Sequence, residues 1–162
     1  LVGTDRTSQE RTGFILTWYR STPPTDDLVA RLQQQEIPEV EVDRDEMDRV
    51  RLSIRNLQFV ADQAVLLPGE RGRLDDIAEL LSSVPETEIL VTGHTADVGT
   101  QESQMVLSVE RAKKIVDELV ERGIRPGRLR YEGKGGTEPV GDNSTEEGRA
   151  ANRRVELRLL SE

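Results

Sequence analysis

The chain has 162 residues, of which 33% are charged and only 3% aromatic, and its formal net charge is -9. This length can bury a core without crosslinks, and the core must rest on Leu, Val and Ile instead of aromatic rings. Acidity and scarce aromatic residues exclude nucleic acid as an expected partner, because that binding uses basic surfaces and stacking. Cysteine is absent, which excludes disulfides, thiolate metal sites and thiol catalysis.

Signals for membrane insertion or export are not visible in the sequence. No apolar run approaches the roughly 20 residues of a membrane-spanning helix. The first residues, Leu1 to Thr4, show neither the basic start nor the apolar core of a signal peptide. We expect a processed or trimmed piece of a longer protein, with a membrane tether supplied only by sequence that is not present here.

Residues 1–38 are predicted to form an N-terminal extension. After a polar tail, alternating apolar residues predict a short strand at 13–20. A short helix is predicted at 26–35, with Thr25 as its N-cap and Pro38 closing it.

Residues 39–162 are predicted to form one α+β domain. Period-two alternation of apolar residues predicts strands, and apolar spacing of three or four predicts helices. The expected elements are an edge strand within 39–49, a strand at 50–54, a helix from Pro68 to about 83, a strand at 88–92, a helix at 102–122, a strand near 129–131, a glycine-rich loop at 133–141 and a last strand at 155–160. A strand end or bulge is expected near 55–56, and Gly123 is placed to cap the long helix. Without the edge strand, this order is βαβαββ. It predicts a mixed sheet with helices packed on one face.

The junction between the strand at 88–92 and the long helix is a candidate binding site. Gly93 opens a loop whose backbone N–H groups, together with the helix dipole, favour a carboxylate. Arg111 lies near the middle of the helix, and a guanidinium can bind a carboxylate through two hydrogen bonds. Strand-loop-helix junctions are common, however, and an Arg on an amphipathic helix is usually a solvated residue.

A longer series of motifs makes the site more specific. The series comprises Gly93-His94-Thr95, Gly99, Leu107-Ser108, Arg111-Ala112, Gly123-Ile124, Gly133, Gly135, Pro139, Asn143, Gly148-Arg149-Ala150 and Asn152-Arg153-Arg154-Val155-Glu156. Over residues 40–160 their order and spacing resemble the OmpA-like (OmpA C-terminal) peptidoglycan-binding domain family. The resemblance implies the OmpA-like fold and a domain that holds the peptide stem of peptidoglycan without cutting it.

The resemblance also implies roles for particular residues. In that family an Asp after Gly-His-Thr receives the ammonium of diaminopimelate, and the Arg of Leu-Ser-x-x-Arg-Ala receives its carboxylate. Thr95 and Arg111 match by position, but Ala96 stands where the Asp is expected, Asp97 is displaced by one residue, and Gln104 replaces the usual Asn. Because an ammonium without its carboxylate partner binds less well, diaminopimelate binding is expected to be weaker than is normal in the family.

Two alternatives for the ammonium contact stay open. Asp97 could provide it if the loop rotates, or the wall could contain another diamine such as ornithine. Val60 also stands where the family often has Asp or Asn, with Asp62 two residues further on. The resemblance implies a spirochaete origin as a subsidiary expectation, because spirochaete members show this kind of substitution and have ornithine in their walls.

The remaining polar motifs predict less. Arg153 and Arg154 alternate across the start of the last strand, and Arg154 is the one we expect in the ligand groove. His94 is the only histidine and lacks neighbours for a metal site, so it is expected to pack or to hydrogen-bond within its loop. The Gly-rich segment 133–136 lacks the Lys-Ser/Thr ending of a phosphate-binding loop. No cofactor or metal is expected.

The leading prediction is a non-catalytic module that anchors a bacterial envelope protein to the cell wall, in the periplasm or at the outer membrane. A first alternative is a structural or protein-interaction module that keeps the fold but has lost diaminopimelate-type wall binding. An enzyme of wall metabolism is disfavoured, because one histidine and no cysteine provide no nucleophile and base pair and no set of metal ligands.

Overall fold

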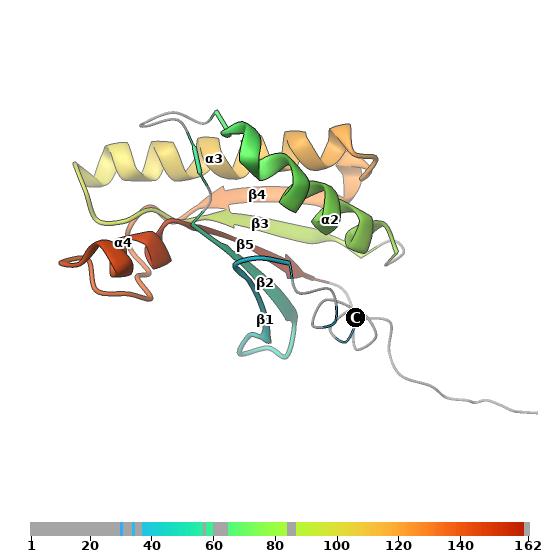
Figure 1. The fold of residues 1–162 in the computed structure, drawn as a ribbon, viewed down its shortest axis with the longest axis horizontal. Coiled ribbons are helices and arrows are strands. Elements are labelled where there is room, and N and C mark those ends of the chain that lie inside the picture. The colour runs from blue at the N-terminus through green and yellow to red at the C-terminus, as the bar shows by residue number, and fades with distance from the viewer. Residues whose placement is uncertain are drawn as a thin grey trace, which may run out of the picture.

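A five-stranded mixed sheet organises the part of the chain that the computed structural model describes, namely Ala30, Gln34 and residues 37–56, 58–59, 65–83 and 87–160. The strand order is β1-β2-β5-β3-β4, with β3 and β4 parallel and the other neighbours antiparallel (Figure 1). The strands are β1 (Val40–Arg44), β2 (Val50–Arg55), β3 (Ile89–Gly93), β4 (Leu129–Gly133) and β5 (Arg154–Leu159). The helices are α2 (Arg71–Ser82), α3 (Gln101–Glu121) and α4 (Glu146–Asn152), with short 3-10 helices η1 (Pro68–Glu70) and η2 (Pro126–Arg128). The predicted α+β mixed sheet is confirmed.

Helices α2 and α3 cover one face of this sheet, as predicted (Figure 1). Their apolar stripes and the alternate residues of the strands form one core, which supplies most of the driving force for folding. Its fully buried large side chains include Leu52 and Ile54 of β2, Leu157 of β5, Leu74, Ile77 and Leu81 of α2, and Ile115 and Leu119 of α3. Among the described residues no helix covers the opposite face of the sheet, which is rich in charged side chains.

The hairpin of β1 and β2 forms one edge of the sheet. Val40 and Val42 pack against the core from β1, while Glu41 and Asp43 are exposed. β2 ends at Arg55, and Asn56 has a φ of 54°, a left-handed conformation that Asn tolerates better than most residues. The predicted edge strand and the predicted strand end are confirmed.

The two ends of α3 are set by local chemistry. The hydroxyl of Thr100 accepts a hydrogen bond from an N–H of the first turn at 3.0 Å, and Thr100 is therefore the N-cap. Gly123 follows the helix with a φ of 102°. The N–H groups of Gly123 and Ile124 donate to the carbonyls of Val120 and Leu119, which is the hydrogen-bond pattern of a glycine C-cap. The prediction for Gly123 is confirmed.

The buried face of α3 differs from the predicted apolar stripe at its N-terminal end. Met105 begins the series of apolar residues, spaced by three or four, that predicts this helix. It is nevertheless 38% exposed, whereas Gln104 and Ser108 are buried. The helix crosses β3 and β4 at Gly93 and Gly133, where an added Cβ would overlap atoms of Ser108. Backbone and helix therefore meet without an intervening side chain, and the inward positions are small or polar.

Helix α4 was not predicted, because its segment reads as the end of a long loop. It has seven residues and contains Gly148, so it is too short for an apolar period to be visible. Its N-cap is Thr145, whose hydroxyl accepts a hydrogen bond from the N–H of Gly148 at 2.9 Å. Two glutamates in the first turn interact favourably with the helix dipole and stabilise the helix. Figure 1 places α4 at the same end of the molecule as the N-terminal end of α3.

Most of the predicted N-terminal extension lies outside the described residues. The strand at 13–20 lies entirely outside them, and of the helix at 26–35 only Ala30 and Gln34 are described, both of them helical. Ile37 is buried in the core of the sheet domain. The domain boundary after residue 38 stays a prediction.

Candidate ligand groove

An open groove of about 880 Å³ runs along the N-terminal half of α3, beside the ends of β2 and β3. We call it the α3 groove. One wall is the exposed side of the first turns of α3. The other sides come from Gln58 and Phe59 after β2, from Thr95, Ala96 and Val98 after β3, and from Arg153 before β5. Three segments that are distant in the sequence therefore meet at this end of the sheet.

Thr95 and Ala96 are buried where the chain leaves β3 and enters the groove. The N–H of Thr95 donates to the carbonyl of Gly135 at 2.9 Å, and the N–H of Gly135 donates to Ser108 Oγ at 2.9 Å. These bonds fix the loop between the glycine-rich segment and α3. Because the Ala96 side chain is a methyl group, the wall is apolar at the position where the resemblance led us to expect a carboxylate.

Asp97 is adjacent to Ala96 but does not line the groove. Gln104 Nε2 donates to Asp97 Oδ1 and to the carbonyl of Gly99, both at 3.0 Å. The N–H of Asp97 in turn donates to Asn143 Oδ1 at 3.2 Å. Asp97 and Gln104 thus hold the loop against the start of α3, and only Gln104 also lines the groove.

Arg111 lines the groove about three turns into α3. Its guanidinium lies over the ring of Phe59, 4.6 Å from the ring centroid, in a cation-π contact. The guanidinium is a planar group of N–H donors. The contact with Phe59 holds this group beside the groove.

Of the two adjacent arginines before and in β5, the structure places Arg153 on the groove and Arg154 on the other face of the sheet. Val155 packs in the core beneath the helices, so its neighbour Arg154 points the opposite way. Arg154 is buried, and its Nε donates to Glu156 Oε2 at 2.8 Å. Arg153 forms an ion pair with Glu146 of α4. The predicted ligand role of Arg154 stays a prediction, and the geometry favours Arg153.

Arg153, Glu110 and Phe59 are among the groove residues that were not singled out in the sequence as ligand contacts. Strand alternation could have placed Arg153 on the helix side of the sheet, because Arg153 and Val155 are two residues apart and face the same way. The sequence also shows that Glu110 precedes Arg111 on the helix, but this alone does not predict a ligand contact. Phe59 could be placed only by the fold, because it reaches the groove from a different part of the chain.

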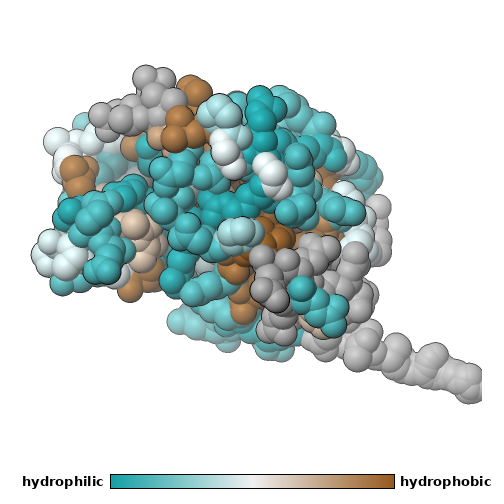
Figure 2. All heavy atoms as spheres, in the orientation of Figure 1, coloured by the Kyte–Doolittle hydropathy of each residue, from teal (hydrophilic) through white to brown (hydrophobic). Residues whose placement is uncertain are grey.

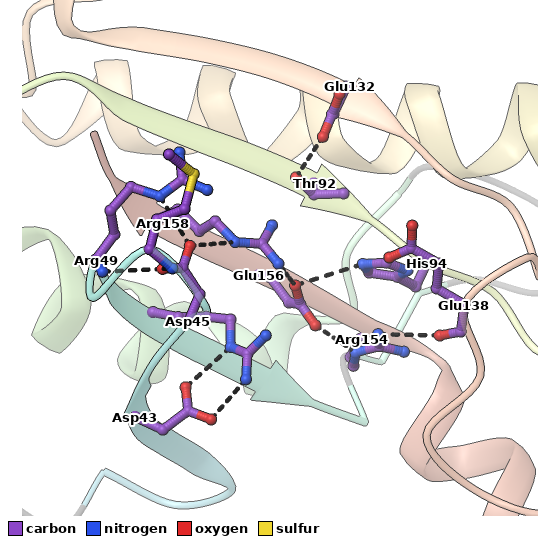
Figure 3. Close-up of polar contacts among 12 residues, drawn as sticks. Asp43, Asp45, Arg49, Thr92, His94, Glu132, Glu138, Arg154, Glu156 and Arg158 are labelled. Atoms are coloured by element: carbon purple, nitrogen blue, oxygen red, sulfur yellow. Dashed lines mark hydrogen bonds and ion pairs between the residues drawn. The ribbon is translucent and has the colours of Figure 1, made fainter.

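Buried ion pairs occupy the helix-free face of the sheet, around Glu156 (Figure 3). Burial acts to raise the pKa of Glu156, but polar contacts with His94 and Arg154 outweigh it and lower this pKa to about 2. Arg158 Nη2 lies 3.0 Å from Glu156 Oε1. His94 Nε2 is 3.6 Å from the same oxygen, too far for a hydrogen bond, so its contact is electrostatic. His94 therefore faces the ion pairs and does not line the α3 groove itself. It does line a small cavity together with Phe59, Arg111 and Arg153.

Other classes of site are not formed by the described residues. None of their helices has the length and apolarity that crossing a membrane requires. They contain no group of three or more His, Cys, Asp or Glu side chains arranged to hold a metal ion. Val60 and Asp62, which the resemblance led us to consider near the exit of the first strand, lie outside the described residues.

Comparison with known proteins identifies the family. The model of the OmpA family matches residues 58–153, which is more than half of the chain. "Outer membrane protein A" of Bordetella avium is 39% identical over 102 residues, covering 63% of this chain and 53% of that protein. "Peptidoglycan-binding protein ArfA" of Mycobacterium tuberculosis strain H37Rv is 36% identical over 101 residues, covering 62% of this chain and 31% of that protein. The chain thus matches between about a third and a half of the length of such relatives.

A solved structure agrees with the sequence comparison. The cell wall anchor of the T6SS from Pseudomonas aeruginosa superimposes with a TM-score of 0.68 and 33% identity, covering 84% of this chain and 96% of that one. The matched family segment contains the strands, loops and helix that form the α3 groove. The chain therefore belongs to the OmpA family.

Proposed function

We propose that this chain binds the peptide stem of peptidoglycan in the α3 groove, without cleaving it, and so anchors an envelope protein to the cell wall. The observation that carries the proposal is the placement of Arg111, whose guanidinium is held by Phe59 beside an open groove. A planar guanidinium can bind a stem carboxylate through two hydrogen bonds. Arg153, on the same groove, is a second cation for that end of the ligand.

Family members support this proposal. One relative is named a peptidoglycan-binding protein, and one similar structure is named a cell wall anchor. Thr95, Ala96 and Gln104 also line the groove, whereas Asp97 does not line it and instead holds the loop through its hydrogen bond with Gln104. We assign these residues to ligand contact or to loop support accordingly.

The proposal is for binding and not for catalysis. His94, the chain's only histidine, is buried against Glu156 and does not line the groove, so it is not placed to act on a ligand there. The relatives include outer membrane proteins, and we propose an envelope location, facing the periplasm, for this domain. A membrane tether, the domain boundary after residue 38 and a spirochaete origin stay predictions.

A second function is favoured by the apolar part of the same groove. Ala96 replaces the acidic side chain of the family pattern, and Val98 and Val106 are 64% and 51% exposed at the rim. Exposed apolar residues beside a groove are typical of protein-interaction surfaces. The alternative is therefore an interaction module that keeps the fold but has lost diaminopimelate-type wall binding.

Co-sedimentation with purified sacculi tests the wall-binding function. The wild-type chain is expected to sediment with sacculi of the diaminopimelate type, of the ornithine type, or of both. Arg111→Ala is expected to weaken binding at least tenfold, because a charge-assisted bidentate contact contributes roughly 1.5–3 kcal/mol. Arg71→Ala, which removes an exposed arginine of α2 outside the groove, is the control. Wild-type protein that binds neither type of sacculus would favour the interaction module.

Restoring the family's acid tests which half of the ligand site is missing. Ala96→Asp is expected to strengthen binding to diaminopimelate-type sacculi several-fold, because it returns a carboxylate to the groove wall. The same assay measures it, with the unfolding midpoint as a check on stability. If Ala96→Asp folds normally but leaves binding unchanged, the apolar wall is not what weakens the ammonium contact.

A further inference from the structure

Glu110 is an acidic residue of the α3 groove that the family pattern does not assign. On α3 it directly precedes Arg111 and lines the same groove. At 100° per residue, Glu110 and Ser103 lie near the centre of the helix face that forms the groove wall, between Val106 and Leu107. The Glu110 side chain is exposed and makes no hydrogen bond or ion pair with another described residue.

The ion pairs of α3 explain why Glu110 has no partner among the described residues of the helix. Lys114, one turn further on, would be its usual partner, because Glu and Lys four residues apart form a favourable pair. Lys114 Nζ instead lies 2.9 Å from Glu118 Oε2, and Glu118 Oε1 lies 2.7 Å from Arg122 Nη1. Lys113 pairs with Asp117 at 3.3 Å. The lysines that follow Glu110 are thus engaged by acids further along the helix.

The other acids near the groove have local roles. Asp97 accepts from Gln104 and does not line the groove. Glu102 lines it but lies in the first turn of α3, where a negative charge is stabilised by the helix dipole. It is also eight residues from Glu110, about 12 Å along the helix. Among these described acids, Glu110 is the one beside Arg111, and neither a local hydrogen bond nor the helix dipole accounts for its charge.

We infer that Glu110 receives the ammonium group of a zwitterionic wall ligand whose carboxylate is bound by Arg111. This inference rests on the proposed wall-binding function and supplies the cation contact that Ala96 lacks. The ligand class is a stem peptide whose diamino acid has a free side-chain amine. In this arrangement the cation and anion contacts come from one wall of the groove, on consecutive residues of α3.

The test combines one substitution with one modification of the ligand. Wild-type chain and Glu110→Gln are each titrated against purified sacculi, of the type that binds best, before and after acetylation of the free amines. Acetylation should weaken wild-type binding roughly fivefold, as expected for one partly exposed ion pair. Glu110→Gln should bind untreated sacculi roughly fivefold more weakly than wild type, and acetylation should change its binding by less than about twofold. Glu121→Gln, an exposed acid on the same helix outside the groove, should behave like wild type.

Each outcome separates the inference from the function on which it rests. If wild type binds untreated sacculi but Glu110→Gln binds them equally well, wall binding stands and the role of Glu110 is wrong. Equal sensitivity of both proteins to acetylation would also overturn it, since the amine would then have another partner. If wild type binds no sacculi, the wall-binding function fails and the inference fails with it.

Discussion

Gly93 sets the distance between β3 and α3. A Cβ at this position would overlap the backbone carbonyl of Ser108, and backbone of a helix cannot give way as a flexible side chain can. We therefore expect Gly93→Ala to lower the free energy of unfolding by about 1–3 kcal/mol, the usual range for overpacking. Urea denaturation measures the change. Gly127→Ala is the matched control, because an added Cβ there meets no atom within 4 Å, and an equal loss in both variants would show that close approach is not the cause.

Glu156 should make the stability of the domain depend on pH in the acid range. Its pKa falls from an ordinary 4.5 to about 2 in the folded chain. A carboxyl with a lowered folded pKa stabilises the fold above its unfolded pKa, and this contribution is lost as pH falls from about 4.5 to about 2. The shift corresponds to a contribution on the order of 3 kcal/mol at neutral pH.

Urea unfolding from pH 7 down to pH 2 measures this effect. Glu156→Gln is expected to be less stable than wild type at pH 7, and the gap should narrow as the pH approaches about 2. Glu79→Gln on the exposed side of α2 should show no comparable pH-dependent gap. A gap of constant size for Glu156→Gln would mean that its charge state does not contribute.

At the scale of elements, Asn152 connects α4 to the loop before it and, through that loop, to the groove. Its Oδ1 accepts the N–H groups of Val140 and Gly141 at 2.7 and 2.8 Å. Its Nδ2 donates to the Gly141 carbonyl at 3.0 Å and to Asn143 Oδ1 at 2.8 Å. Asn143 Oδ1 also accepts the N–H of Asp97. One fully buried side chain thus fixes two loops.

Asn152→Asp should break this connection with almost no change in size. The carboxylate keeps the two accepted bonds but loses both donors and faces two oxygens, so we expect a loss of about 2–4 kcal/mol. Hydrogen exchange should show faster exchange at the amide of Asp97, which depends on Asn143. Asn56→Asp is the control, because the side-chain oxygen of Asn56 accepts a bond that a carboxylate can also accept. Unchanged protection at Asp97 would show that the loops are held independently.

The elements that could be predicted are those whose pattern is long or whose ends are marked. The period of α3 extends over 21 residues and Gly123 marks its end, so both were predicted from sequence. α4 has no such length, and its helix depends on the cap at Thr145. Ser108 is buried and Met105 is not, because α3 packs closely against two glycines of the sheet. The apolar spacing of one helix does not predict such a contact between distant segments.

The site shows the same division between local pattern and tertiary contact. Thr95, Ala96, Gln104 and Arg111 were predicted from motif positions, and the structure brings them to one groove. Asp97 was considered a replacement for the missing acid, but Gln104 engages its carboxylate. That hydrogen bond depends on how the loop folds over α3, which spacing in the sequence does not specify.

At the scale of the whole molecule, the groove is a local site on an acidic and mainly hydrophilic surface. Figure 2 shows one face on which hydrophilic residues predominate and hydrophobic ones form small patches. The net charge is -9, so the chain as a whole repels an anionic polymer. A wall peptide that carries more carboxylates than amines is such a polymer. In the proposed function, attraction therefore comes from short-range contacts at Arg111 and Glu110, while the long-range field opposes approach.

This opposition predicts an unusual salt dependence for wall binding. The screening length falls from about 30 Å at 0.01 M salt to about 8 Å at 0.15 M, which removes long-range repulsion but weakens charge pairs in direct contact much less. Raising NaCl over this range should therefore strengthen co-sedimentation with sacculi or leave it within about twofold. Acetylated sacculi, which have lost positive charge, should show the larger gain. A tenfold loss of binding over the same range would indicate adhesion through scattered basic residues, which lose affinity as salt rises, and not recognition in the α3 groove.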